Sequence, residues 1–67
     1  MIEVTVNGER RQVAAGSTVG DLLADLGRHP RTVAVEHNGA ILPRARYAET
    51  PLAAGDRLEI VHFVQGG

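Results

Sequence analysis

The sequence predicts an α+β fold in which one main helix packs on one face of a four- to five-stranded mixed sheet. Two observations lead to this prediction. Several short segments alternate apolar and polar residues, which is the period of a half-buried strand, and only one segment repeats apolar residues at helical spacing. A chain of 67 residues has room for one domain with one small core. The single helix must therefore cover one face of the sheet.

The first predicted element is a β-hairpin at the N-terminus. Residues 2–6 alternate apolar and polar side chains and predict a strand. Asn7-Gly8 follows, and both residue types tolerate the positive φ angles of a tight hairpin turn. The return strand is residues 9–13. A two-residue turn would pair Ile2 with Val13 and place both on one face of the sheet.

The second predicted element is the helix, which begins after Thr18. The Thr18 hydroxyl can cap a free backbone amide, and Asp21 lies where a capping-box acid is expected. Gly27 suits the position just after a helix, and Pro30 prevents the helix from resuming. The helix is therefore about two to three turns long. One apolar stripe faces the core and consists of Val19, Leu22, Leu23 and Leu26.

The second half of the chain contains three further predicted strands. Residues 32–36 form the third strand, and after an Asn38-Gly39 turn residues 40–42 form a short fourth strand. Residues 44–50 predict one irregular helical turn, and the apolar run in residues 57–64 predicts the last strand. The last strand is expected to pair beside the first. This order of elements is the β-grasp, or ubiquitin-like, arrangement.

The last strand has two faces with different expected roles. Leu58 and Ile60 should face the helix, so Val61 and Phe63 should lie on the open face of the sheet. An exposed apolar pair at this place predicts a docking patch for a partner protein. The alternative is that the strand twists or pairs differently and buries Phe63.

The diglycine Gly66-Gly67 directly follows the last apolar run. Glycine has no Cβ, so residues 65–67 are expected to form a thin, flexible arm beyond a folded domain of residues 1–64. Such an arm can carry its terminal carboxylate into the narrow channel of an ATP-dependent activating enzyme. The alternative is an inert, frayed end.

Composition excludes several other classes of function. The net charge is −1 and Tyr47 and Phe63 are the only aromatic residues, which argues against nucleic-acid binding. Cysteine is absent, so disulfides and thiolate catalysis are excluded, and a cytoplasmic location is favoured. We expect no signal peptide and no membrane-spanning segment. His29, His37 and His62 lack metal-ligand spacing, so no metal site is predicted.

Five segments in order resemble the sulfur carrier proteins of thiamine biosynthesis, the ThiS family, over essentially the whole length. The segments are residues 2–8 (IEVTVNG), 18–23 (TVGDLL), 33–39 (VAVEHNG), 41–44 (ILPR) and 54–61 (AGDRLEIV), which runs on toward Gly66-Gly67. Their order and spacing, together with the diglycine, carry the resemblance.

The resemblance implies a protein co-substrate rather than an enzyme, with no catalytic side chain and no bound cofactor. A ubiquitin-activating-type adenylyltransferase, using ATP and Mg²⁺, would adenylate Gly67, with Gly66 entering its channel. Sulfur from a donor enzyme such as a cysteine desulfurase would then give a thiocarboxylate, which thiazole synthase would receive. Three alternatives remain open: a carrier resembling the small subunit of molybdopterin synthase, a β-grasp interaction module with an inert tail, and a nucleic-acid-associated β-grasp domain.

Overall fold

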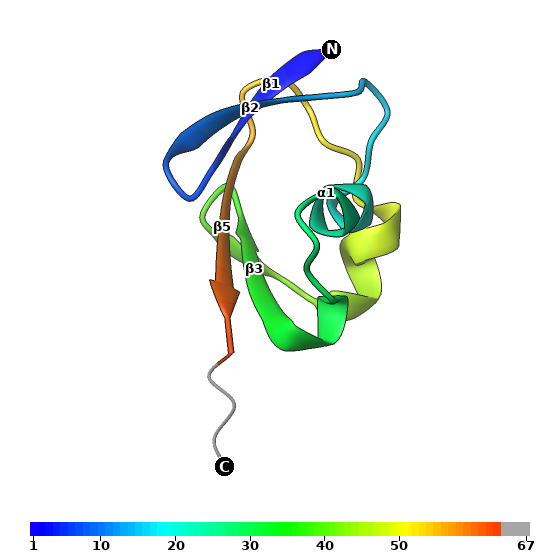
Figure 1. The fold of residues 1–67 in the computed structure, drawn as a ribbon, viewed down its shortest axis with the longest axis vertical. Helices are drawn as coiled ribbons and strands as arrows, with labels where there is room; N and C mark the ends of the chain where they lie inside the picture. Colours follow the sequence, from blue (N-terminus) through cyan, green and yellow to red (C-terminus); the bar gives the residue numbers. More distant parts are fainter. Residues whose placement is uncertain (64–67) are drawn as a thin grey trace.

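The computed structural model describes residues 1–63, which form a five-stranded mixed sheet with one α-helix on one face (Figure 1). The strand order is β2-β1-β5-β3-β4, so the last strand lies in the middle of the sheet beside the first. The predicted α+β class and β-grasp order are confirmed. The elements are β1 (Ile2–Val6), β2 (Glu9–Val13), α1 (Val19–Asp25), η1 (Pro30–Thr32), β3 (Val33–His37), β4 (Ala40–Leu42), η2 (Arg44–Glu49) and β5 (Arg57–His62).

The N-terminal hairpin forms as predicted. β1 and β2 pair antiparallel with Ile2 opposite Val13, and Asn7 has the positive φ of 50° that this turn requires. β5 then pairs parallel with β1 and antiparallel with β3. The chain therefore returns to the centre of the sheet for its last strand, whose C-terminal end lies at the opposite end of the molecule from the N-terminus (Figure 1).

Helix α1 begins with the capping box that the sequence predicts. Thr18 Oγ1 accepts a hydrogen bond from the Asp21 backbone amide at 3.1 Å, and Asp21 Oδ2 accepts one from the Thr18 amide at 3.0 Å. The helix ends at Asp25, and Gly27 adopts a φ of +71°, a conformation that costs glycine little. These two ends hold the helix to seven residues, about two turns.

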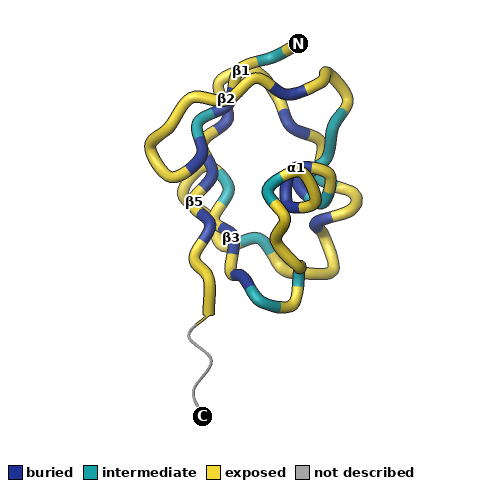
Figure 2. The backbone as a smooth tube through the Cα atoms, in the orientation of Figure 1, coloured by how far each residue is buried: buried dark blue, intermediate teal, exposed yellow. Residues whose placement is uncertain are grey.

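The core lies between the helix and the sheet (Figure 2). Leu22 and Leu23 are fully buried, and Tyr47 from η2 closes one side with its hydroxyl 3.4 Å from the Val33 carbonyl oxygen. The predicted irregular turn at residues 44–50 is thus a 3₁₀ helix that contributes to the core. The buried apolar residues are Val4, Val6, Val13, Val19, Leu22, Leu23, Val33, Val35, Tyr47, Leu52, Leu58 and Ile60.

The structure differs from the sequence prediction around the third strand. β3 begins at Val33 rather than Thr32, because Pro30–Thr32 form a short 3₁₀ helix that the sequence did not predict. The His29 ring caps this turn, since its Nδ1 accepts a hydrogen bond from the Arg31 amide at 3.1 Å. β3 also extends one residue further than predicted, to His37.

A buried carboxylate, Asp56, fastens the turn that precedes β5 to the end of β3. Its Oδ2 accepts a hydrogen bond from the Ala53 amide at 2.9 Å and lies 2.9 Å from His37 Nε2, while its Oδ1 accepts one from Asn38 Nδ2 at 3.1 Å. Burial raises the pKa of Asp56, but the hydrogen bonds from His37, Ala53 and Asn38 stabilise the carboxylate. Together they hold its pKa below the ordinary value of 3.8.

We expect Asp56→Asn to destabilise the fold by about 2 kcal/mol at neutral pH, because it removes a charged acceptor that three donors share. The folded-state pKa is lowered, so the contribution of Asp56 is complete above the unfolded-state pKa and is lost as pH falls through the folded value. Urea unfolding of both proteins should therefore show a stability gap at pH 7 that narrows below about pH 4. A gap of the same size at both pH values would contradict this role.

Candidate functional site

The site that the sequence predicts lies at the C-terminal end of β5 and beyond it. Gly66 and Gly67, and the predicted boundary between residues 64 and 65, lie outside the described residues. The structure does describe β5, which ends at His62 rather than at the predicted residue 64, and Phe63 after it. The position of β5 in the sheet therefore fixes where the described part of the chain ends.

Hydrogen bonds on both edges hold β5 in place. The backbone ladder with β1 ends where Val6 faces Leu58, but the Asn7 side chain continues the pairing. Asn7 Nδ2 donates to the Ile60 carbonyl at 3.1 Å, and Asn7 Oδ1 accepts from the Ile60 amide at 2.7 Å. On the other edge the Phe63 amide donates to the Thr32 carbonyl at 2.8 Å. The described end of the strand is therefore fixed to the sheet through Phe63.

The two faces of β5 are sharply different. Leu58 is fully buried and Ile60 is 8% exposed on the helix side, whereas Val61 is 61% and Phe63 is 45% exposed. The structure thus places Val61 and Phe63 on the exposed side of the strand, as the alternation predicts. The exposed residue Ala34 lies opposite Val61 on β3, and its small side chain leaves Val61 uncovered. We call Val61 and Phe63 the open-face patch; its binding role stays a prediction.

Carboxylates flank the open-face patch. Glu36 on β3 lies directly opposite Glu59 on β5, and both side chains are exposed. Glu36 also lies opposite Ile41 on β4, which is 79% exposed. Like charges that face each other across a sheet repel. Arg57 on β5 is also exposed and shares the face of Glu59 and Val61, so the open face is an apolar surface with charges of both signs at its border.

The three histidines do not converge. His29 caps η1, His37 binds Asp56, and His62 lies at the end of β5. Within residues 1–63 the structure contains no group of three or more side chains arranged to hold a metal ion. In the same part of the chain, no helix has the length and apolar character needed to cross a membrane.

Sequence reasoning missed two residues that shape this region. Asn7 was interpreted only as a turn residue, although its side chain also extends the sheet to Ile60. The sequence predicts no role for Asp56, although this residue is buried and receives several hydrogen bonds. An aspartate between a glycine turn and an apolar strand is a weak signal for such a role, and the Asn-Gly pair carries no signal for a contact fifty residues away.

Comparisons with known proteins bear on this strand end and the diglycine. Residues 4–67 match the sequence model of the ThiS family. The sulfur carrier protein ThiS of Bacillus subtilis is 46% identical over 50 residues, which cover 75% of this chain and 76% of that protein. A crystal structure of the thiamine biosynthesis protein ThiS from Geobacter metallireducens has a TM-score of 0.83 and 35% identity, covering 98% of this chain and all of that one.

A longer relative matches the same region. The thiazole synthase of Paramagnetospirillum magneticum is 46% identical over 66 residues, which cover 98% of this chain but only 20% of that protein. The match to a thiazole synthase from Magnetococcus marinus also covers 98% of this chain and 20% of that protein. The chain therefore spans about a fifth of the length of these two relatives. The likeness therefore concerns one region of each synthase.

Residues 1–63 form one α-helix on a mixed five-stranded sheet. This arrangement defines a ubiquitin-like β-grasp protein. Because the family match covers almost the whole chain, the protein belongs to the ThiS family of sulfur carriers of thiamine biosynthesis. The Bacillus subtilis relative is named a sulfur carrier protein.

Proposed function

We propose that this chain carries sulfur as a thiocarboxylate on Gly67 and delivers it for thiazole formation in thiamine biosynthesis. The observation that carries the proposal is the extent of the family match, which runs through residue 67 and so includes the diglycine. A family match that takes in both glycines is expected where the diglycine takes part in the reaction. Residues 1–64 would then be the folded carrier domain and residues 65–67 its reactive tail.

The proposed chemistry needs only the carboxylate of Gly67 from this chain. A C-terminal carboxylate has a pKa of about 3.5 and is anionic at neutral pH. It attacks the α-phosphorus of ATP, pyrophosphate leaves, and an acyl-adenylate forms. The terminal sulfur of the donor's persulfide then attacks the carbonyl carbon, and AMP leaves with one of the original carboxylate oxygens. A thiol would reduce the S–S bond of the resulting acyl disulfide, which releases the thiocarboxylate and leaves a disulfide. The activating enzyme would bind ATP and Mg²⁺, and the metal ion would stabilise the phosphate charge.

The described part of the chain would supply position and docking. β5 is hydrogen-bonded on both edges near its end, so the point from which the tail departs is fixed relative to the sheet. Fixing a reacting group relative to a docking surface lowers the entropic cost of reaching the attack geometry. The open-face patch of Val61 and Phe63 lies on the same strand end and would contact the partner that receives the tail.

Three proteins are the proposed partners, all in the cytoplasm. A ubiquitin-activating-type adenylyltransferase would form the adenylate, and a cysteine desulfurase would supply the sulfur. Thiazole synthase would accept it, which the match to one region of two thiazole synthases supports. A region of this kind within a synthase chain would be held close to the site that consumes its sulfur.

An ATP–pyrophosphate exchange assay with the activating enzyme tests this function. The intact chain should stimulate exchange, and the sulfur-loaded chain should support thiazole formation by thiazole synthase. A chain that is activated but transfers no sulfur to thiazole synthase would serve another pathway, such as one resembling molybdopterin synthesis. A chain that never stimulates exchange would be an interaction module instead.

Phe63→Asp should weaken binding to the activating enzyme or to thiazole synthase by about 2 kcal/mol, because a buried aromatic anchor at an interface contributes on this scale. The side chain is exposed, so the variant should fold normally. Ile41→Asp is the matched control, since Ile41 is exposed on the same face but two strands away. Calorimetric titration gives the affinities. Equal affinities for the wild type and Phe63→Asp would exclude the patch as a docking surface.

A further inference from the structure

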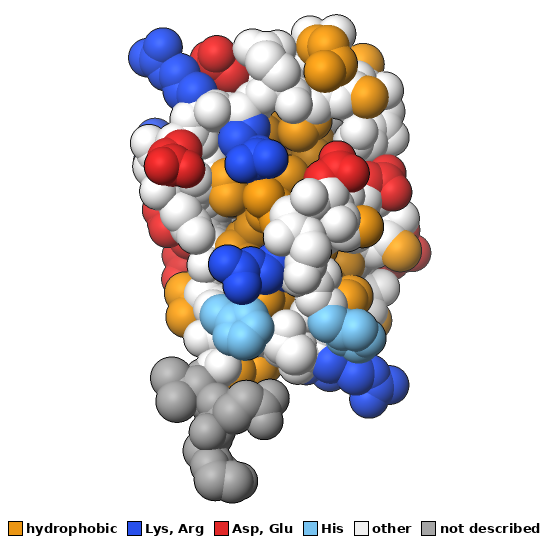
Figure 3. Space-filling view, in the orientation of Figure 1, with side chains coloured by type: hydrophobic (Ala, Val, Ile, Leu, Met, Phe, Trp, Pro, Cys, Tyr) orange, Lys and Arg blue, Asp and Glu red, His pale blue; other side chains and the backbone are white. Residues whose placement is uncertain are grey.

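A small groove lies on the helix side of the sheet, on the opposite face of β5 from the open-face patch. It occupies about 200 Å³ between the turn of the β1–β2 hairpin, the C-terminal half of β5 and the end of α1. The space-filling view shows apolar side chains in a hollow between basic ones on this face (Figure 3). The lining residues are Val6, Asn7, Glu9, Arg11, Leu26, Arg28, Ile60 and His62.

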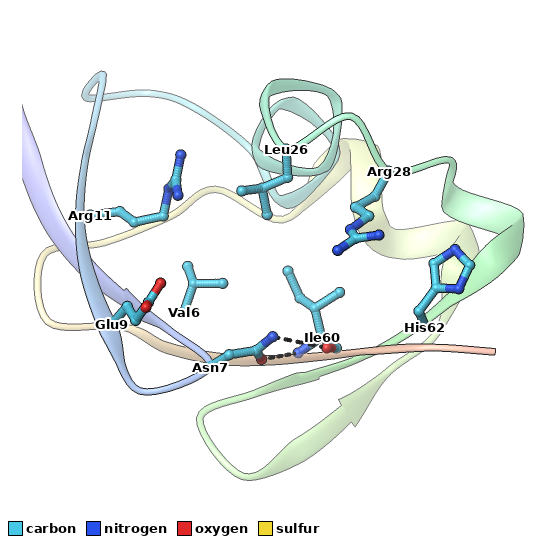
Figure 4. A pocket seen from close by; sticks show the side chains of 8 residues that line it. All are labelled: Val6, Asn7, Glu9, Arg11, Leu26, Arg28, Ile60 and His62. Atoms are coloured by element: carbon cyan, nitrogen blue, oxygen red, sulfur yellow. Dashed lines mark hydrogen bonds between the residues drawn. The ribbon is translucent and has the colours of Figure 1, made fainter. Parts of the chain in front are cut away.

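The groove exists because β5 continues past the end of β1. The backbone pairing of these strands stops at Val6 and Leu58, and only the Asn7 side chain spans the gap to Ile60. Val6 and Ile60 form the floor, and Leu26, which follows the helix, lies above them (Figure 4). The volume is below the 300–1,000 Å³ typical of small-molecule sites, so the groove fits one large side chain better than a cofactor.

The border of the groove is mainly basic. Arg11 from β2 and Arg28 from the segment after α1 reach toward it from opposite sides (Figure 4). Within residues 1–63 neither arginine forms an ion pair, because the ion pairs found there join His37 to Asp56 and Arg46 to Glu49. Glu9 is the one carboxylate in the lining. On the open face, by contrast, Glu36 and Glu59 lie beside the patch together with Arg57, so that face carries charges of both signs.

We propose that this groove binds an acidic segment of a partner protein, with one large apolar side chain inserted between carboxylates that pair with Arg11 and Arg28. An inserted side chain covers the apolar floor, and carboxylates match the two guanidinium groups in charge and geometry. The inference rests on the proposed function, because the occupant is a partner that also receives the tail. His62 lines the groove and is the last residue of β5, so the groove extends to the end of this strand.

The test measures the affinity of the full chain for the activating enzyme and for thiazole synthase by calorimetry. Arg11→Glu and Arg28→Glu should each weaken binding to at least one of these proteins by about tenfold, with a loss that grows at low salt. Arg10→Glu is the matched control, because Arg10 lies on the same strand but on the opposite face, and it should stay within about twofold. Glu9→Gln should strengthen binding, since it removes a carboxylate that repels the occupant.

Milder variants and a separate readout keep the outcomes distinct. If a charge reversal lowers the melting temperature, Arg11→Gln and Arg28→Gln replace it and should still weaken binding. Unchanged affinity of the Arg11 and Arg28 variants for both proteins would overturn the groove proposal, as would a wild-type chain that binds neither protein. Pyrophosphate exchange is measured on the same samples. Normal exchange with unchanged affinities would reject the groove alone, whereas binding that depends on Arg11 and Arg28 without any exchange would support the groove and reject the carrier chemistry.

Discussion

Removing Gly66 and Gly67 is expected to abolish activation while leaving the fold intact. Within the described residues 1–63 the buried core ends at Ile60, and the hydrogen bonds that fix β5 extend as far as Phe63. The truncated chain should therefore unfold with a free energy within about 0.5 kcal/mol of the wild type, the scale of a surface change. Pyrophosphate exchange should fall to background, because the new terminus is shorter and ends in a residue with a side chain.

A chain with one residue added after Gly67 is the complementary variant. It keeps the diglycine but moves the carboxylate by roughly 3.5 Å, far enough to lose the attack geometry. Thermal melts and exchange assays on the three proteins separate the possible roles. Exchange by the truncated chain would show that the diglycine is incidental, and a truncated chain that unfolds would show that the tail is structural.

Leu58→Ala should be the most destabilising of these substitutions, with a cost of about 2–5 kcal/mol. Leu58 is fully buried in β5, the central strand that joins the hairpin to β3. A single core in a chain below about 70–80 residues rarely supplies more than about 3–5 kcal/mol of stability, so part of the population should be unfolded at room temperature. Urea unfolding measures the loss.

Ile41→Ala provides the matched control for Leu58→Ala, because Ile41 is 79% exposed. It should change stability by no more than about 0.5 kcal/mol. Similar stabilities for the two variants would show that β5 does not organise the core. Exchange activity of the folded fraction of Leu58→Ala should persist, since the substitution leaves the tail unchanged.

Local signals explain why most of the fold could be predicted from the sequence. The Asn7-Gly8 turn fixes the hairpin register, and the Thr18–Asp21 capping box fixes the start of the helix, so both elements were predicted correctly. Each depends on residues a few positions apart. Pro30–Thr32 was missed because proline was interpreted only as a helix breaker, although its fixed φ also suits the first position of a short 3₁₀ turn.

Features that depend on distant residues could not be predicted. The Asn7 contact with Ile60 spans 53 positions, and Asp56 meets His37 across 19 positions. The groove combines residues from the hairpin, the segment after α1 and β5, so its basic border becomes visible only when these elements meet. The alternation along β5 is a local pattern, so the exposure of Val61 and Phe63 could be predicted from the sequence. The residues that lie beside them on the neighbouring strand could not be predicted in this way.

Mass spectrometry of the chain after incubation with the activating enzyme, ATP and a sulfur donor tests the carrier proposal most directly. The intact protein should gain the mass difference of one oxygen-to-sulfur exchange, and fragmentation should place the sulfur on Gly67. The truncated chain treated in the same way should keep its original mass. Sulfur located at any other residue, or an unchanged mass in the intact chain under conditions where a known ThiS carrier is converted, would contradict the proposal.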